Sequence, residues 1–320
     1  STSSSISPDG TRLITIDRSS GAPVVTMRRI GAEAGTPQPV ANVEATSATP
    51  AAAISQIQLG DRIAWAPDNQ HVVVAVAGAG IWLLDTAGNQ TALSVATESA
   101  VTAIAWSMSG QSVALGLWNN GSHSSVIATL SLQNPVASPV PILSLPESDG
   151  RYIRSMAWGT EQVGVLFALR SATGDMTVSN DLYSVRKLGE PMRLIASAGV
   201  AAPIAAIDQI ALADNGTTVA FAVQVPGEVG LKFDSIWVTD VTTTGAVRAN
   251  TSGLRRIAEL EWTPRGLVVV GTRRVLDDGN GYVLNAVEIV SANAPVSIAV
   301  DRSPATPVGS PEASPASPTS

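Results

Sequence analysis

Apolar and polar positions along the chain recur in one phrase. Ile63–Val76 reads IAWAPDNQHVVVAV, and Ile104–Leu117 reads IAWSMSGQSVALGL. In both, a segment with alternating apolar residues leads into a small polar turn, and a nearly continuous apolar run follows. Alternation predicts a half-buried strand, and Pro, Asp, Asn and Gly predict a tight reversal. The β-branched run predicts a strand that is covered on both faces, so each phrase predicts an antiparallel strand pair.

The phrase occurs six times at intervals of 41 to 59 residues, which indicates a repeat architecture. The copies begin at Ile6, Trp65, Trp106, Trp158, Leu212 and Trp262. A third strand follows in each unit, most clearly at Ile81–Gly88 and Ile236–Gly245, and a weaker fourth strand comes after it. Units of four short antiparallel strands without helical periodicity predict an all-β fold, a β-propeller of six four-stranded blades.

The ends of the pattern leave alternatives open. The first unit has only STSSSI in place of a strong first strand, so either the chain is trimmed there or a weak N-terminal strand closes the ring. A seventh blade in residues 20–60 is an alternative, although that stretch lacks a second turn phrase. We expect one propeller domain over residues 1–302, with an Ala/Thr/Pro-rich loop at 31–53. Residues 303–320 are rich in Ser and Pro and predict a disordered tail, because they cannot bury enough apolar surface to offset their ordering entropy.

Several of these motifs resemble those of TolB-like, WD-repeat-like bacterial propellers. They are the Ser-Pro-Asp-Gly turn at Ser7–Gly10, its variants at 66–69 and 263–266, and the Ile-Trp-hydrophobic-x-Asp start of the third strands. The resemblance covers about residues 1–300, although the Gly-His pair and the terminal Trp-Asp of eukaryotic WD repeats are missing. It implies a propeller from a group that includes periplasmic binding proteins, lipoprotein domains and propellers fused to peptidases. This chain has no room for a peptidase domain.

Composition narrows the function classes. Charged residues make up 14% of the chain and the net charge is −7, without a basic cluster, which argues against nucleic acid binding. The absence of Cys excludes disulfides, thiolate metal sites and Cys nucleophiles. No apolar run reaches the roughly 18–20 residues that span a bilayer. A low-charge chain bounded by Ser/Thr/Pro-rich segments suits an exported bacterial protein, so we expect a periplasmic, cell-surface or secreted location, with membrane tethering through a region outside this chain.

Motifs for catalysis and cofactors are weak, and we expect no catalytic residue, cofactor or metal. There is no Gly-x-Ser-x-Gly elbow, and His71 and His123 lie far apart in the sequence. LDDGNG at Leu276–Gly281 lacks the spacing of a calcium loop. Few acids fall on the predicted innermost strands, so carboxylate catalysis at the ring axis is unsupported. They are Asp61, Asp208, Glu259 and Glu261.

Differences between the repeats indicate where function lies. The Trp that ends most first strands predicts packing between adjacent blades, because it belongs to the constant phrase. The segment between the second and third strands instead grows from AGAG at 77–80 to RSATGDMTVSND at 170–181. In a propeller these loops share one face, which we call the loop face, and mixed loops on a rigid scaffold are typical binding sites. Freely tolerated loop insertion is the alternative explanation. The residues predicted to bind a partner are Trp118, His123, Arg151, Tyr152, Asp175, Phe233, Arg274, Asp277, Asp278 and Tyr282.

The sequence therefore favours a non-catalytic, exported propeller. It would serve as a protein-binding scaffold or accessory subunit at the cell envelope or in a membrane-associated complex, with another protein as its partner. One alternative is a propeller hydrolase or lyase that acts on a sugar or lactone. The other is the ligand-sensing domain of a lipoprotein.

Overall fold

The computed structural model describes residues 2–19, 22–30, 38–42, 60–95, 99–175, 177, 180–201, 204–226, 231–242, 246–249, 256–263, 266–277 and 280–291. Within these residues the strands form six antiparallel sheets, which we number as blades 1–6 in chain order. Blades 1–3 contain β1 (Thr2–Ile6), β2 (Arg12–Asp17), β3 (Val24–Arg29) and β4 (Gln38–Asn42); β5 (Arg62–Trp65), β6 (His71–Val76), β7 (Gly80–Asp85) and β8 (Gln90–Ala92); β9 (Ser99–Trp106), β10 (Ser112–Asn119), β11 (Ser124–Ser131) and β12 (Val140–Leu145). Blades 4–6 contain β13 (Arg151–Trp158), β14 (Val165–Ser171), β15 (Leu182–Val185) and β16 (Arg193–Ala196); β17 (Ala206–Leu212), β18 (Thr218–Pro226), β19 (Leu231–Asp240) and β20 (Ala246–Ala249); β21 (Arg256–Thr263), β22 (Gly266–Asp277) and β23 (Asn280–Ser291). Two short 3₁₀ helices, η1 (Glu147–Asp149) and η2 (Ala198–Val200), lie in the connections before blades 4 and 5.

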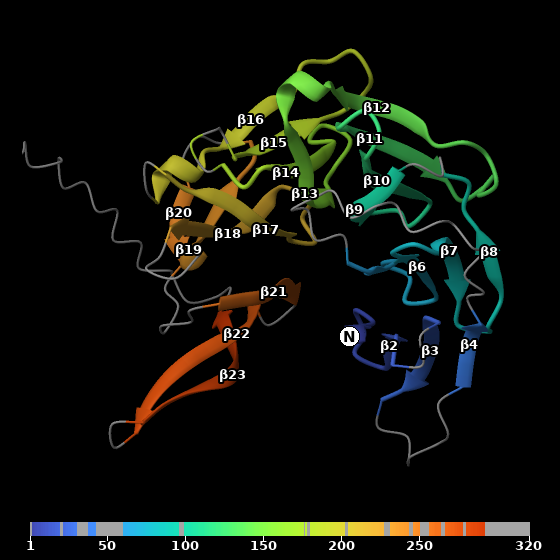
Figure 1. Ribbon diagram of the computed structural model, residues 1–320, viewed down its shortest axis with the longest axis horizontal. Helices are drawn as coiled ribbons and strands as arrows, with labels where there is room; N and C mark the ends of the chain where they lie inside the picture. The colour runs from blue at the N-terminus through green and yellow to red at the C-terminus, as the bar shows by residue number, and fades with distance from the viewer. Residues whose placement is uncertain are drawn as a thin grey trace, which may run out of the picture.

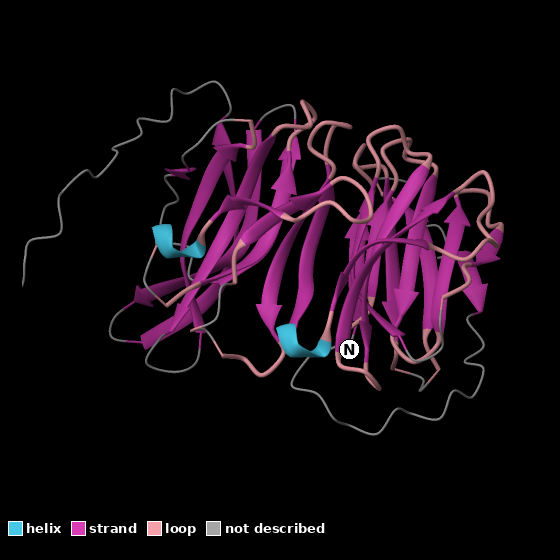
Figure 2. Ribbon diagram, turned by 90° about the horizontal axis from the view of Figure 1, so that it is seen from above, coloured by secondary structure: helices cyan, strands magenta, loops and turns pink. Residues whose placement is uncertain are grey.

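The blades stand side by side in chain order around a common axis, as a β-propeller requires (Figure 1). The first strand of each blade lies nearest the axis, and in blades 1–5 the fourth lies outermost (Figure 1). The loop face, where the first strands begin, carries the N-terminal end of the chain and forms the lower edge of Figure 2. We call the opposite side, which holds the turns after the first and third strands, the turn face. The all-β propeller predicted from the sequence is confirmed.

The turn of the repeated phrase has the backbone that its residues predict. Its fourth position is left-handed, with φ between 58° and 72° at Gly10, Asn69, Gly110 and Gly216. The amide of each of these residues donates to the carbonyl three residues earlier, at 2.8–3.1 Å. Left-handed backbone favours Gly and tolerates Asn, which explains why these two residue types occupy the position in blades 1, 2, 3 and 5.

Apolar clusters join each blade to the next. The second strands β6, β10, β14 and β18 are buried along most of their length, as their β-branched runs predict. Their side chains fill five clusters, one between each successive pair of blades from 1/2 to 5/6. The core is therefore divided among the blade interfaces.

The repeated Trp side chains belong to these interfaces, as predicted. Trp65 is 9% exposed and packs with residues of blade 1. Its indole nitrogen donates to the Ser5 carbonyl of blade 1 at 3.4 Å. The indoles of Trp106 and Trp262 likewise donate to carbonyls on the first strand of the preceding blade, at 2.8 and 3.1 Å. These three Trp side chains thus join blades 2, 3 and 6 to the blades that precede them.

Three expectations change in the structure. β4 (Gln38–Asn42) lies inside the segment predicted to be a loop at 31–53, so that prediction is wrong for these residues; β4 is the fourth strand of blade 1. β1 pairs with β2 along its whole length and supplies the first strand that STSSSI predicts only weakly. In blades 5 and 6, much of the expected loop sequence instead extends the strands, up to the pair Asp277–Asn280.

The fourth strand expected in blade 6, at 296–300, and the tail at 303–320 lie outside the described residues. The blade count therefore stays a prediction.

Candidate functional site

A β-bulge recurs at one position of the innermost strands on the loop-face side. In each of four first strands, one residue is left out of the strand pairing because the register shifts. It lies four residues before the Trp or Leu of the repeated phrase. The unpaired residues are Thr102, Arg154, Asp208 and Ala258, in four successive blades. Asp61, just before β5, has the same spacing from Trp65. Because bulges redirect side chains, the sequence can place a different group near the axis in each blade.

In blade 2 the position holds a buried carboxylate. The Asp61 side chain is 4% exposed and accepts two hydrogen bonds from Arg18 of blade 1, at 2.6 and 3.0 Å. The Ala77 amide donates a third, at 3.0 Å. Burial acts to raise the pKa of Asp61, but these donors outweigh it and hold the pKa below its ordinary value of 3.8. Asp61 is therefore an ionised partner of Arg18.

In blades 4 and 5 a second buried carboxylate holds two arginines. Asp208 Oδ1 accepts from Arg154 Nε at 2.8 Å and from Arg170 Nη1 at 3.1 Å, and the Asp208 side chain is 4% exposed. Arg170 also donates to Gln224 at 2.7 Å. Burial acts to lower the pKa of Arg154, yet the hydrogen bond and charge of Asp208 raise it overall. A buried carboxylate needs such partners, since an unpaired charge is costly to desolvate.

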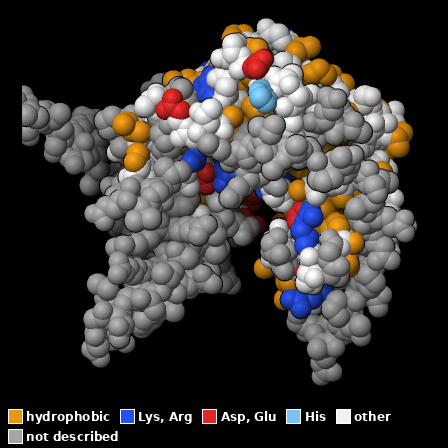
Figure 3. Space-filling view, in the orientation of Figure 1, with side chains coloured by type: hydrophobic (Ala, Val, Ile, Leu, Met, Phe, Trp, Pro, Cys, Tyr) orange, Lys and Arg blue, Asp and Glu red, His pale blue; other side chains and the backbone are white. Residues whose placement is uncertain are grey.

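Arg62 adds a further cation, from blade 2, to this charged group. It starts in blade 2, and its Nε donates to the Thr102 carbonyl of blade 3 at 2.9 Å. It lies near enough to Arg154 and Asp208 for their charges to act on it, and Tyr152 lies among the same charges. Figure 3 shows acidic and basic side chains together around the hollow at the centre of this face. We call the group the axial cluster; its members are Arg18, Asp61, Arg62, Tyr152, Arg154, Arg170, Asp208 and Gln224.

Aromatic side chains adjoin the axial cluster. Trp118 stacks on His123 with ring centroids 6.2 Å apart and meets Tyr152 edge-on at 6.4 Å. Trp118 is among the residues predicted to bind a partner, but it lies in β10 and is only 3% exposed. Its indole N–H is buried without a hydrogen-bond partner among the described residues. His123 is exposed in the turn after β10, at a left-handed φ of 48°. The structure thus joins three predicted residues into one cluster.

Two other predicted residues, Arg151 and Asp175, have local partners. Arg151 starts β13 and forms a two-pronged ion pair with Asp149, at 2.7 and 2.8 Å. This hydrogen bonding raises the pKa of Arg151, and the guanidinium also lies 5.9 Å from the centre of the Tyr183 ring. Asp175 is exposed in the loop of blade 4, and its carboxylate accepts from the amide and hydroxyl of Thr177. Arg151 therefore links the start of β13 to Asp149 and Tyr183, which gives it a structural role within blade 4.

The predicted residues of blades 5 and 6 are placed only by their strands. Phe233 lies in β19, Arg274 and Asp277 lie in β22, and Tyr282 lies in β23, while their side chains fall outside what the structure describes. Asp278 lies outside the described residues. Partner binding stays a prediction for all ten residues.

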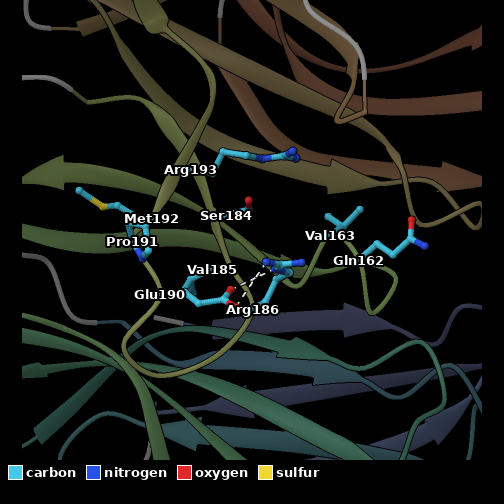
Figure 4. A pocket seen from close by; sticks show the side chains of 9 residues that line it. All are labelled: Gln162, Val163, Ser184, Val185, Arg186, Glu190, Pro191, Met192 and Arg193. Atoms are coloured by element: carbon cyan, nitrogen blue, oxygen red, sulfur yellow. Dashed lines mark hydrogen bonds and ion pairs between the residues drawn. The ribbon is translucent and has the colours of Figure 1, made fainter.

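A cavity of about 520 Å³ lies on the turn face, away from the axial cluster. In Figure 4 its labelled side chains come from the turns around Val163 and Glu190 and from β15 and β16. Arg186 and Glu190 both line the cavity and form an ion pair, with Arg186 Nε 3.0 Å from Glu190 Oε2. None of the predicted partner-binding residues lines this cavity.

The arginines of the axial cluster are functional candidates that the sequence analysis missed. It found Asp61 and Asp208 as acids of the innermost strands, but did not pair them with Arg18, Arg154 or Arg170. Alignment of the repeats on the Trp position was the available signal, because the residue four places earlier changes chemistry from blade to blade. Arg18 and Arg170 follow or end second strands and carry no such signal.

Comparisons with known proteins support the fold. No protein-family model matches the chain, and no curated protein matches it. Among solved structures, an oligogalacturonate lyase in complex with manganese has a TM-score of 0.59 at 12% identity, over 89% of this chain and 75% of that one. TolB from Acinetobacter baumannii has 0.52 at 13%, over 88% and 62%. The Cps50 (Swd1) β-propeller domain from Myceliophteria thermophila has 0.51 at 12%, over 88% and 82%.

The class that these findings define is the β-propeller, with the fold of TolB and of a WD-repeat-like domain. The resemblance predicted from the sequence is confirmed at this level. Both an enzyme and TolB are among the similar structures, so the fold by itself does not choose a function. Within the described ranges, no helix is long and apolar enough to cross a membrane. Those ranges also hold no group of three or more His, Asp or Glu arranged to bind a metal.

Proposed function

We propose that this protein is a non-catalytic binding propeller that captures another protein on its loop face. The observation that supports this is a continuous row of contacts across blades 3 and 4. Exposed His123 stacks on Trp118, Trp118 meets Tyr152, and Tyr152 lies among the charges of the axial cluster. Aromatic and Arg side chains in such a row are typical of interface hot spots.

The state of the axial carboxylates favours binding over catalysis. Acid–base catalysis by two carboxylates requires that both reach the substrate. Asp61 and Asp208 are each 4% exposed and already accept hydrogen bonds from arginines. A hydrolase or lyase mechanism would have to break these pairs first, so we propose a scaffold or accessory subunit instead of an enzyme.

Composition supports an extracytoplasmic setting for this role. The chain lacks Cys, is low in charge and ends in a Ser/Pro-rich segment. We propose that it acts at the cell envelope, as part of a membrane-associated complex.

Site-specific photocrosslinking tests the proposal. A photoreactive residue at His123 or Asp175 reports on the loop face, and one at Leu188, which is 60% exposed on the turn face, is the matched control. In cells that produce the 320-residue chain, we expect one discrete crosslinked protein from the loop-face positions and none from Leu188. Equal crosslinking from both faces, or none from either, would argue against a loop-face partner.

A further inference from the structure

Arg62 is a cation without an acidic partner inside the axial cluster. Its hydrogen bonds go to backbone carbonyls, from Nε to Thr102 at 2.9 Å and from Nη1 to Asp61 at 3.0 Å. Among the residues whose side chains the structure describes, no carboxylate lies within ion-pair distance of the Arg62 guanidinium. Arg62 is half-buried, so water screens its charge only partly.

The surroundings of Arg62 add positive charge. Burial lowers its pKa, and the neighbouring charge of Arg154 lowers it further. A guanidinium stays protonated under all ordinary conditions, so the repulsion remains. Both axial carboxylates are already engaged: Asp61 holds Arg18, and Asp208 holds Arg154 with Arg170. The axial cluster therefore carries four arginines against two carboxylates, within an acidic chain of net charge −7.

We infer that the axial cluster binds a carboxylate group, held by Arg62 and Arg154 with the Tyr152 hydroxyl as a further donor. The planar fork of a guanidinium matches a carboxylate in two-pronged hydrogen bonds. Asp208 already pairs with Arg154 beside this position, so a singly charged carboxylate meets less repulsion from Asp208 than a phosphate dianion does.

This inference rests on the proposed function and deepens it, because an acidic segment of the partner would supply the group. A free small carboxylate has the same chemistry and is the other source to separate. Trp118 provides a reporter, since its ring contacts Tyr152 at 6.4 Å and its environment changes when Tyr152 is engaged.

Calorimetric titration of the purified chain at low ionic strength tests the inference. Two probes carry one carboxylate each: acetate for the free source, and an acetylated, C-terminally amidated peptide with a single Glu for the protein source. Inorganic phosphate serves for comparison. We expect Arg62→Gln to weaken carboxylate binding about tenfold or more, since charge-assisted hydrogen bonds are the strong ones. Arg186→Gln, on the turn face, is the matched control and should bind like the wild type. Tryptophan fluorescence should respond to ligand in the wild type and lose that response in Trp118→Phe.

Each result decides the question. Circular dichroism and thermal unfolding establish that Arg62→Gln is folded, and Arg62→Lys, which keeps the charge without the fork, should bind with intermediate strength. Binding of the peptide supports a partner's acidic segment, and binding of acetate alone assigns the group to a small molecule. The inference is overturned if wild type binds neither probe, if Arg62→Gln binds like wild type, or if phosphate binds as tightly as the carboxylates. If photocrosslinking at His123 succeeds in that case, the proposed function stands and the carboxylate site alone fails.

Discussion

Single residues in this propeller combine support of the fold with control of charge near the axis. Asp61 illustrates this, because its carboxylate joins blade 1 to blade 2 through Arg18 and also accepts from the Ala77 amide. Asp208 does the same between blades 4 and 5 through Arg154. Removing one partner of such a pair costs more than the pair contributes, since the other charge stays buried.

The Asp61 pair makes stability depend on pH. The folded-state pKa of Asp61 is lowered, so its contribution is present above the ordinary value of 3.8 and is lost as pH falls through the folded value. At neutral pH, Asp61→Asn should reduce the free energy of unfolding by about 2 kcal/mol. The difference from wild type should shrink below pH 4, as measured by urea unfolding at a series of pH values. Asp214→Asn, in an exposed turn, is the control. A pH-independent difference would contradict the assignment.

At the scale of elements, the repeated turn keeps one backbone conformation from blade to blade while its residues vary. Its left-handed fourth position takes Gly in blades 1, 3 and 5 and Asn in blade 2. The third position supplies a side-chain acceptor for the amides that follow, as Asp68 does for Gln70 and His71. The turn therefore tolerates exchange only among residues that satisfy both needs.

Gly110 tests this requirement. A Cβ there would meet only Pro67, at an ordinary 3.5 Å, so any effect of substitution reflects the φ of 70°. Gly110→Ala should lower the free energy of unfolding by about 1–2 kcal/mol. Gly110→Asn should cost less, because Asn69 occupies the equivalent position in blade 2. Chemical denaturation of both variants measures this; equal losses would show that packing, not backbone conformation, sets the cost.

Most strands could be predicted from the sequence, because apolar alternation and turn residues are local signals. β4 could not, since Gln38–Asn42 has one large apolar residue and lies in an Ala/Thr/Pro-rich stretch. The polar sequence RRVLDDGNG at 273–281 predicts a loop, and only pairing with β23 makes residues 273–277 a strand. The axial cluster depends on contacts between blades, such as Arg154 with Asp208, whose partners are 54 residues apart. Local sequence patterns do not show which residues so far apart in the chain come into contact.

At the scale of the whole molecule, cohesion comes from neighbouring blades. Blades 2–5 each share apolar clusters with two neighbours, whereas within the described residues blade 1 shares one with blade 2 only and blade 6 with blade 5 only. Structures stabilised by nearest-neighbour interfaces lose their end units first.

Native-state hydrogen exchange checks this prediction. Amides of β14, in blade 4, should exchange at least about tenfold more slowly than those of β2, in blade 1. Among the described residues, local opening of blade 1 breaks one apolar interface and local opening of blade 4 breaks two. Mass spectrometry of peptic fragments measures both in one sample, and β10 in blade 3 should behave like β14. Uniform protection across β2, β10 and β14 would indicate that the end blades are held as firmly as the inner ones.

The recurrent bulge of the innermost strands has a consequence for how this protein diversifies. A residue left out of strand pairing can be exchanged without altering the ladder of backbone hydrogen bonds on either side. Thr102, Arg154 and Asp208 occupy such positions in blades 3, 4 and 5, so each blade can carry a different side chain there. Relatives of this chain could therefore change ligand preference by exchanging these residues in matched pairs, such as Arg154 together with Asp208, while inheriting the scaffold unaltered.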